Sequence, residues 1–401
     1  MDLEILISSS LVATLLLLSS IHNFYKAEGR IVSEEEDLEL DRQLKILNKP
    51  LIKTIVATNG DIVDCIDIYR QPAFDNPLLK NHEHKVKRII KQELLLNEAN
   101  ASSKKISVLE HYYNESHCPF GTVPIIRTTK KQLVNAKRFS QRMKRSGENA
   151  VFKPTGRTHF VSLETSYIKN KTYLGAWAQI QIKNPDMAPD QFTTAQISVQ
   201  NGPGEDVNSI EFGWAVYPEL FSDADTRIFA YWTGDGYKRR GCFNMLCSGF
   251  VLVNHEIPLG ASLANTGRAF LGSRVVRDPQ PDDGWWLYLL DIKIGFFPKP
   301  IFTHPEDEAT IIKYGGLANA EPNKPFPQMG AGSLPDFDFE KSCHFTHMRV
   351  YDKNGEPGDF DPNIVQMRHD ASVDCYDLAF YGRNHTGWGL TMSFGGPGGS
   401  C

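Results

Sequence analysis

Residues 208–218 read Asn-Ser-Ile-Glu-Phe-Gly-Trp-Ala-Val-Tyr-Pro, a run of β-branched and aromatic residues that stops at a proline. Similar runs recur through the second half of the chain, separated by Gly, Pro, Asn and Asp, which is typical of short strands joined by turns. Strands do not alternate with helical patterns, so a parallel sheet is not indicated. The sequence therefore predicts a mainly β fold, an antiparallel sandwich or barrel. The other runs are 193–199, 228–233, 250–253, 285–292 and 392–394.

The composition is that of a folded protein without a charged face for nucleic acid. The chain has 401 residues, of which 41% are hydrophobic and 23% charged, enough to bury one or two cores. Its formal net charge is -5, and Lys and Arg do not recur on one face at helical or strand spacing. Nucleic acid is therefore excluded as a partner.

The first residues predict export from the cell. An apolar stretch covers residues 5–21, short for a bilayer span and interrupted by serines, so we expect a signal peptide at 1–27 and a secreted, extracellular protein without stable membrane association. Asp2 and Glu4 stand where a positive charge is usual, which leaves an uncleaved membrane anchor as the alternative. Four glycosylation sequons support the secretory route; they begin at Asn100, Asn114, Asn170 and Asn384.

The region before residue 150 predicts a small α+β unit and an exposed basic segment. Leucines at roughly helical spacing indicate a helix from residue 34 to residue 47. The runs 54–58 and 61–69 flank Asn59-Gly60, a strong hairpin signal. Residues 130–145 are basic with few large apolar side chains, either a solvated helix face or a processing linker, and we place the domain boundary near residue 150.

Cysteine spacing favours disulfides over metal. Cys242 and Cys247 are five residues apart beside glycines that permit a tight loop. Zinc would need two further Cys or His ligands, and the sequence has no CxxC or HxxxH pair to supply them. We therefore expect no metal and no cofactor.

Glu211 is a carboxylate inside an aromatic strand, and two interpretations remain open at this point. Period-two alternation places it on the same strand face as Ser209 and Gly213. An edge strand that turns this face to water would explain it without function. The other interpretation is a functional carboxylate, and since no G-x-S-x-G motif occurs, carboxylates are the natural candidates if the protein is an enzyme.

Specific blocks of the chain resemble the neprosin family of plant glutamic endopeptidases. Residues 47–50, 61–82 and 118–124 resemble its activation peptide, and later blocks resemble its catalytic domain. The resemblance implies an activation peptide with a basic linker at 28–150 and a lectin-like β-sandwich with an open cleft at 151–401. The later blocks are 208–218, 231–237, 241–250, 285–287, 329–332 and 394–398.

The family's chemistry uses two glutamates for peptide hydrolysis, preferentially after proline and in acid, and Glu211 matches one of them. The second usually follows Trp-Gly-Gly, whereas this chain has Tyr314-Gly315-Gly316-Leu317, so a side chain that cannot titrate stands there. Glu321 is the nearest carboxylate downstream of Leu317, and four residues of extended strand would place it about 13 Å from that position. Aromatic residues of the expected substrate cleft are Trp214, Trp232 and Tyr237.

The resemblance also implies the remaining disulfides. Cys65 would pair with Cys118 inside the activation peptide, and Cys375 with Cys401. Cys343 then has no partner, and we expect a buried free thiol rather than a nucleophile.

Two hypotheses follow for function. The first is a secreted zymogen of a prolyl endopeptidase that binds its own propeptide and cleaves proline-containing peptides or proteins, with activity impaired by Leu317. The second is an inactive relative whose cleft binds proline-containing peptides or cell-wall glycans. A carboxylate within about 6 Å of Glu211 would favour the enzyme, and an apolar wall would favour the binding protein.

Overall fold

We analysed a computed structural model of the chain, which describes residues 34–99, 109, 111–113, 117–144, 158–264, 266–277, 284–304, 308–384 and 387–401. The chain forms two units, residues 1–45 and 46–401, and helix α2 (Glu34–Leu47) begins in the first and ends in the second. The expected signal peptide at 1–27 and the expected boundary near residue 150 lie outside the described residues. In the described ranges we find no helix with the length and apolarity needed to span a bilayer.

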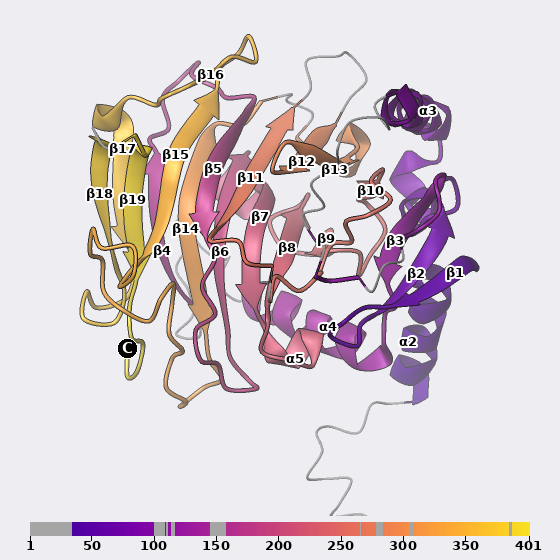
Figure 1. The fold of residues 1–401 in the computed structure, drawn as a ribbon, viewed down its shortest axis with the longest axis horizontal. Helices are drawn as coiled ribbons and strands as arrows, with labels where there is room; N and C mark the ends of the chain where they lie inside the picture. The colour runs from indigo at the N-terminus through magenta and orange to yellow at the C-terminus, as the bar shows by residue number, and fades with distance from the viewer. Residues whose placement is uncertain are drawn as a thin grey trace, which may run out of the picture. The chain divides into compact units, whose positions relative to one another are not determined.

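The first part of the second unit is the small α+β structure that the sequence predicts. Strands β1 and β2 pair antiparallel across a turn in which Gly60 has a φ of 88°, and β3 adds to β2, which confirms the hairpin at Asn59-Gly60. Helix α3 lies between β2 and β3 along the chain and helix α4 follows β3, as the labels in Figure 1 show. The elements are β1 (Leu51–Val56), β2 (Ile62–Asp67), η1 (Pro72–Asp75), η2 (Pro77–Leu79), α3 (Glu83–Ala99), β3 (Thr122–Ile126) and α4 (Lys130–Lys144).

Two large antiparallel sheets make up the rest and confirm the predicted sandwich. The seven-stranded sheet has the order β17-β4-β14-β6-β7-β8-β9. Its strands are β4 (Thr158–Thr165), β6 (Phe192–Asn201), β7 (Asn208–Val216), β8 (Thr226–Thr233), β9 (Gly241–Phe243), β14 (Ile311–Asn319) and β17 (Val365–His369). The short helices α5 (Pro218–Phe221), η3 (Gly204–Asp206), η4 (Lys299–Ile301) and η5 (Pro362–Ile364) lie in its connections.

The second large sheet has nine strands in the order β10-β13-β12-β11-β5-β15-β19-β18, with β16 paired to β15. All of its pairings are antiparallel, as hairpin connections allow. Its strands are β5 (Gly175–Gln181), β10 (Val251–Leu252), β11 (Phe270–Arg277), β12 (Trp285–Leu289), β13 (Ile292–Phe297), β15 (Cys343–Tyr351), β16 (Pro357–Gly358), β18 (Asp377–Asn384) and β19 (Gly389–Gly395).

The main core lies between the two large sheets. Side chains alternate along β7, so Ile210, Phe212 and Trp214 point into this core while Glu211 points to the other face. The opposite sheet contributes Trp286 and Phe296 to the same core. The seven-stranded sheet therefore has one face packed in the sandwich and a second face outside the sandwich, called the free face below, which can carry a site.

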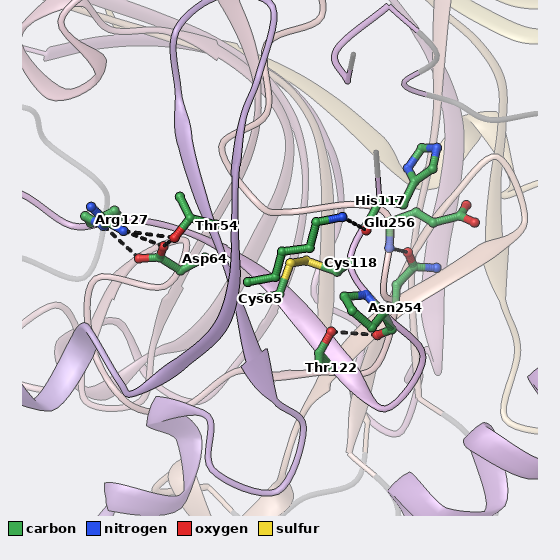
Figure 2. Close-up of a disulfide and its surroundings, with 11 residues drawn as sticks. Thr54, Asp64, Cys65, His117, Cys118, Thr122, Arg127, Asn254 and Glu256 are labelled. Atoms are coloured by element: carbon green, nitrogen blue, oxygen red, sulfur yellow. Dashed lines mark hydrogen bonds and ion pairs between the residues drawn. A yellow bond between two sulfur atoms is a disulfide. The ribbon is translucent and has the colours of Figure 1, made fainter. Parts of the chain in front are cut away.

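Three disulfides are formed, and they are the three expected pairs. Cys65 bonds Cys118, Cys242 bonds Cys247 and Cys375 bonds Cys401. The first closes a loop of 53 residues, which lowers the entropy of the unfolded chain by an amount worth about 4 kcal/mol in the chain-entropy model. Figure 2 shows this bond on β2, with the Asp64 and Arg127 ion pair of the same small sheet to one side.

The small α+β structure is attached to the edge of the nine-stranded sheet. The side-chain amide of Gln71 donates to the carbonyl of Leu252 at 2.9 Å, and its Oε1 accepts from the Leu252 N–H at 2.7 Å. Gln71 thus bonds edge strand β10 as another strand would. Lys293 on β13 pairs with Glu93 on α3 at 2.5 Å between Nζ and Oε1, which adds a second attachment.

The basic segment is exposed on one face and buried on another. Residues 130–144 form helix α4, and Leu133, Asn135 and Phe139 on it are buried. Its start is a capping box, because the Thr129 hydroxyl accepts from the Gln132 N–H and Gln132 Oε1 accepts from the Thr129 N–H. The solvated helix face that the sequence allows is present, because Lys131, Lys137 and Arg138 are exposed, whereas Asn135 and Phe139, four residues apart, belong to a buried face of the same helix.

Candidate active site

Glu211 occupies the middle of the free face of the seven-stranded sheet. β7 is the fifth of the seven strands, and only 4% of Glu211 is exposed. Its neighbours in register are Ser198 on β6 and Tyr231 on β8. The edge-strand interpretation of this carboxylate is therefore wrong, and its burial calls for partners.

Three side chains donate hydrogen bonds to the Glu211 carboxyl. The Tyr237 hydroxyl lies 2.7 Å from Oε1, the Gln196 amide 3.0 Å from Oε2 and the Ser209 hydroxyl 3.4 Å from Oε1. Ser209 shares the strand face of Glu211, as alternation predicts, and Gln196 comes from the adjacent strand. This set holds the carboxyl in one orientation.

Tyr237 reaches Glu211 from a loop with an unusual backbone. Its φ is 63°, in the left-handed region that a tyrosine rarely adopts, and Gly236 before it has a φ of 67°. The Tyr237 N–H donates to the Thr233 hydroxyl at 2.8 Å, which stabilises the turn. Burial and the nearby carboxyl of Glu211 raise the pKa of Tyr237 well above its ordinary value, so its hydroxyl remains a donor.

Burial raises the pKa of Glu211 because a charge is disfavoured away from water. The hydrogen bonds from Tyr237 and Gln196 and the charge of Lys313 oppose this shift without cancelling it. The carboxyl therefore exchanges its proton at a higher pH than an exposed glutamate, as raised carboxyl pKa values at functional sites do.

Gln196 has an acceptor to spare. Its Nε2 is committed to Glu211, while its Oε1 is buried and has no hydrogen-bond partner among the described residues. A buried unpaired carbonyl is costly, and such atoms are concentrated at sites that bind a ligand or a water. Gln196 and Glu211 can together receive two hydrogens, one on each oxygen.

An open depression of about 440 Å³ lies over this pair. Glu164 on β4 lines the same depression and accepts from Ser162 at 2.6 Å. Its carboxylate also pairs with Lys313 Nζ at 3.1 Å. Strands β14 and β6 lie between β4 and β7, so the backbones of Glu164 and Glu211 are ~14 Å apart. This distance is too great for the two carboxyls to share a proton. The remaining lining comes from residues 160, 161, 198, 200, 237 and 315–317.

Leu317 forms an apolar part of the wall. It lies on β14 opposite Phe160 of β4, and both side chains line the depression. The Leu317 N–H donates to the Thr194 hydroxyl at 3.1 Å. Glu321 lies beyond the end of β14 and is not part of the lining. The position expected for a second glutamate is thus inside the site, and its side chain cannot titrate.

Two of the three expected cleft aromatics lie elsewhere. Trp214 is three residues from Glu211 on one strand, so it faces the sandwich core, where its indole N–H donates to the Gln181 carbonyl at 2.9 Å. Trp232 is opposite Ile210 in register and packs on Phe297, also inside the core. Those two assignments were wrong, and strand alternation is the reason. Tyr237, in contrast, lines the depression.

Cys343 and Asn170, two further expected residues that the structure describes, are not part of the lining of the depression. Cys343 is buried, and burial raises the pKa of its thiol to about 12, which makes it inert. The described residues contain no group of three or more His, Cys, Asp or Glu suited to a metal ion. Asn170 is exposed on the turn after β4, whereas Asn100, Asn114 and the side chain of Asn384 lie outside the described residues.

Comparison with known families identifies both parts of the chain. The neprosin family model matches residues 189–397, which is more than half of the chain, and the neprosin activation peptide model matches residues 54–168. The chain belongs to the neprosin family. Its activation peptide precedes the neprosin domain, which is the order of a zymogen. The activation-peptide match runs through β4, so that model includes a strand of the seven-stranded sheet.

Solved structures with some likeness to this chain include two peptidases and a glycosidase. Scytalido-glutamic peptidase with a transition state analog inhibitor is 11% identical, with a TM-score of 0.33 over 59% of this chain and 97% of that chain. SCP-B of the Eqolisin family of peptidases is 10% identical, with a TM-score of 0.30 over 59% and 96%. The β-porphyranase from Bacteroides plebeius is 8% identical, with a TM-score of 0.19 over 42% and 66%. Likeness this low carries no argument about activity.

Proposed function

We propose that this member of the neprosin family is the secreted zymogen of an endopeptidase that cleaves peptides at proline in acidic solution, with Glu211 as its catalytic carboxyl. The observation that carries the proposal is the buried Glu211 carboxyl, held by Tyr237, Gln196 and Ser209 at the floor of an open depression. The preference for proline and for acid follows from the family resemblance. The disulfides are compatible with secretion.

Glu211 and Gln196 suit a water-activating role. In this scheme the ionised Glu211 accepts one proton from a water molecule. The second hydrogen of that water donates a hydrogen bond to Gln196 Oε1. The water oxygen forms a bond to the peptide carbonyl carbon. Glu211 then donates the proton that it took to the leaving nitrogen as the carbon–nitrogen bond breaks. One carboxyl thus serves first as base and then as acid, so no second titrating group is required for proton balance.

Lys313 adds positive charge to the same depression. Its ammonium group opposes the rise of the Glu211 pKa and pairs with Glu164 at 3.1 Å. A cation at this place favours the ionised base and the negative charge that develops on the carbonyl oxygen. In this scheme the charge of Lys313 replaces part of the function of the family's second carboxylate. The rate of peptide hydrolysis is then lower than with both carboxylates present.

The experiment is incubation of the chain without residues 1–27 between pH 2.5 and 7. We would follow cleavage near residue 150 and hydrolysis of a proline-containing fluorogenic peptide, with Glu211→Gln as the matched control. Cleavage that depends on acid and disappears in Glu211→Gln supports the proposal. Folded protein that cleaves neither chain nor peptide at any pH contradicts it.

A second candidate function is peptide or cell-wall glycan binding without hydrolysis, and Leu317 with Phe160 is the observation that favours it. Leu317→Glu separates the two possibilities. A peptidase that lacks only its second acid should gain activity from this change, roughly 10- to 100-fold. A binding protein should remain inactive and lose affinity, because the change places a charge in an apolar wall.

A further inference from the structure

The free face of the seven-stranded sheet is divided into a polar half and an aromatic half. The polar half contains Glu211 and the depression above it. The aromatic half begins at Leu317 and continues toward α5 as a separate hydrophobic cluster. We call four of its rings the aromatic seat: Phe192 of β6, Tyr217 before α5, Tyr231 of β8 and Phe243 of β9.

Phe139 of α4 fills the aromatic seat. Only 3% of it is exposed, and its ring centroid lies 4.3 Å from Phe243, 4.9 Å from Phe192 and 5.7 Å from Tyr231. The ring planes meet those of Phe243 and Tyr231 at 63°, the edge-to-face arrangement that aromatic rings prefer. The seat is therefore shaped for a flat ring rather than for any apolar side chain.

Polar contacts keep α4 over the seat. The Asn135 amide donates to the Glu219 carbonyl at 2.5 Å, and the Arg138 guanidinium pairs with the Glu219 carboxylate at 3.0 Å. Glu219 belongs to α5, which α4 contacts at this end of the sheet (Figure 1). Helix α4 lies within the matched activation peptide and before the expected boundary near residue 150, so release of the chain up to that boundary would vacate the seat.

The seat shares a wall with the Glu211 site. Tyr231 is opposite Glu211 in register, and its ring stacks on Tyr237 with centroids 5.9 Å apart. The Tyr237 hydroxyl bonds Glu211 at 2.7 Å. Alternate side chains of an extended peptide point the same way at a spacing of about 7 Å, so one peptide can span both the seat and the catalytic carboxyl.

We propose that the aromatic seat is a substrate subsite which, once α4 has left, binds an aromatic side chain of the peptide close to the bond that is cut. The inference rests on the proposed function to the extent that a peptide must enter the cleft. Besides proline, the substrate would then need a Phe or Tyr at one fixed distance from the scissile bond. Phe139 occupies in the zymogen the place that this residue takes later.

The test scans Phe and Ala through each position around the cut bond in a series of proline-containing peptides. The enzyme is the full chain processed in acid, or with trypsin in the basic linker. We expect one position at which Phe raises kcat/KM over Ala by roughly 10- to 100-fold. Ala215 lies on β7 in the same hydrophobic cluster, so Ala215→Leu should reduce the space in the aromatic seat. This variant should lose the preference for Phe and keep the wild-type kcat/KM for the Ala peptides.

Binding of the same peptides to Glu211→Gln, processed in trans, separates this inference from the proposed function. Selective binding of the Phe peptide without hydrolysis by the wild type would retain the subsite and contradict the peptidase. Hydrolysis with no Phe preference at any position, and no effect of Ala215→Leu, would overturn the subsite. Equal affinity of Glu211→Gln for the Phe and Ala peptides would overturn it as well.

Phe139→Ala in the intact zymogen gives an additional check, with Phe120→Ala as its control. Phe120 lies in the same activation peptide and is 52% exposed. Emptying the seat should allow a Phe-containing peptide to bind the zymogen at neutral pH, whereas Phe120→Ala should behave as the wild type. Binding that is the same in both variants would contradict the assignment of the seat.

Discussion

Glu211 places a carboxyl where water is largely excluded, and this gives stability a pH dependence. Burial raises the pKa of Glu211, so the folded protein retains a proton that the unfolded chain releases near its usual value of 4.5. The contribution of this proton to the free energy of unfolding is complete below that value. It is lost as pH rises through the higher pKa that Glu211 has in the folded protein. The free energy of unfolding of the wild type should therefore fall as pH rises above 4.5.

Glu211→Gln removes this titration, and its amide can bond Gln196 Oε1 if the Gln196 amide turns around. We expect the melting temperature of Glu211→Gln to rise relative to the wild type as pH goes from 4 to 7. Thermal unfolding monitored by tryptophan fluorescence measures the difference. Glu205→Gln, an exposed control, should show no such trend. A difference that stays constant across this pH range would contradict the buried-carboxyl interpretation.

Tyr237 tunes the same group. Its hydroxyl donates the shortest of the bonds to Glu211 and opposes the rise of the pKa. Tyr237→Phe should therefore move the lower limb of the pH–rate profile toward neutral pH, because Glu211 must be ionised to take a proton from water. The shift is measured with one fluorogenic peptide across pH 3 to 7. Tyr381→Phe, which only loses a bond to Ser393, should leave the profile in place.

At the scale of elements, helix α4 depends on its capping box. Thr129→Ala removes the hydroxyl that receives the Gln132 N–H and should weaken the helix start by about 1 kcal/mol. Hydrogen exchange followed by mass spectrometry should show faster exchange in 130–144 and little change in β7. Thr129→Ser, which keeps the hydroxyl, is the matched control. Equal exchange in both variants would contradict this role of the cap.

The elements also show which parts of the structure could be predicted from the sequence. The hairpin at Asn59-Gly60 was predictable because its turn signal is local. The burial of α4 was missed because its basic residues outnumber the apolar ones, although Thr129 and Gln132 have the spacing of a capping box. Trp214 and Trp232 were misplaced although alternation from Glu211 already puts Trp214 on the opposite face. Gln196, Glu164 and Lys313 could not be found, since strand register is not written in any short motif.

At the scale of the whole second unit, an ion pair links the hairpin to the seven-stranded sheet. Arg227 of β8 bonds Asp61 at 2.7 Å and also pairs with Asp223. Burial alone would raise the pKa of Asp61, but its bonds to Arg227 and the charge of Arg227 outweigh this and lower it. The attachment is therefore complete above pH 3.8 and is lost as pH falls through the lower folded pKa.

This attachment predicts acid release of the activation peptide. Asp61→Asn should move the release midpoint to higher pH, because the charge that binds Arg227 is missing at every pH. Limited proteolysis of the chain between pH 2 and 7 locates the midpoint, with the Glu211→Gln background used to prevent self-cleavage. Asp67→Asn, in the same hairpin, should leave the midpoint unchanged. An unaltered midpoint in Asp61→Asn would show that this ion pair does not hold the peptide.

The most direct measurement of the central claim is the rate of peptide hydrolysis by the acid-processed wild type and by Glu211→Gln processed in trans, at several pH values on one proline-containing peptide. We predict a rate about 10²- to 10⁴-fold lower in Glu211→Gln, with all cuts of the wild type mapped to the same bond by mass spectrometry. Equal rates in the two proteins, or no hydrolysis by folded wild type, would contradict the assignment of Glu211 as a catalytic carboxyl.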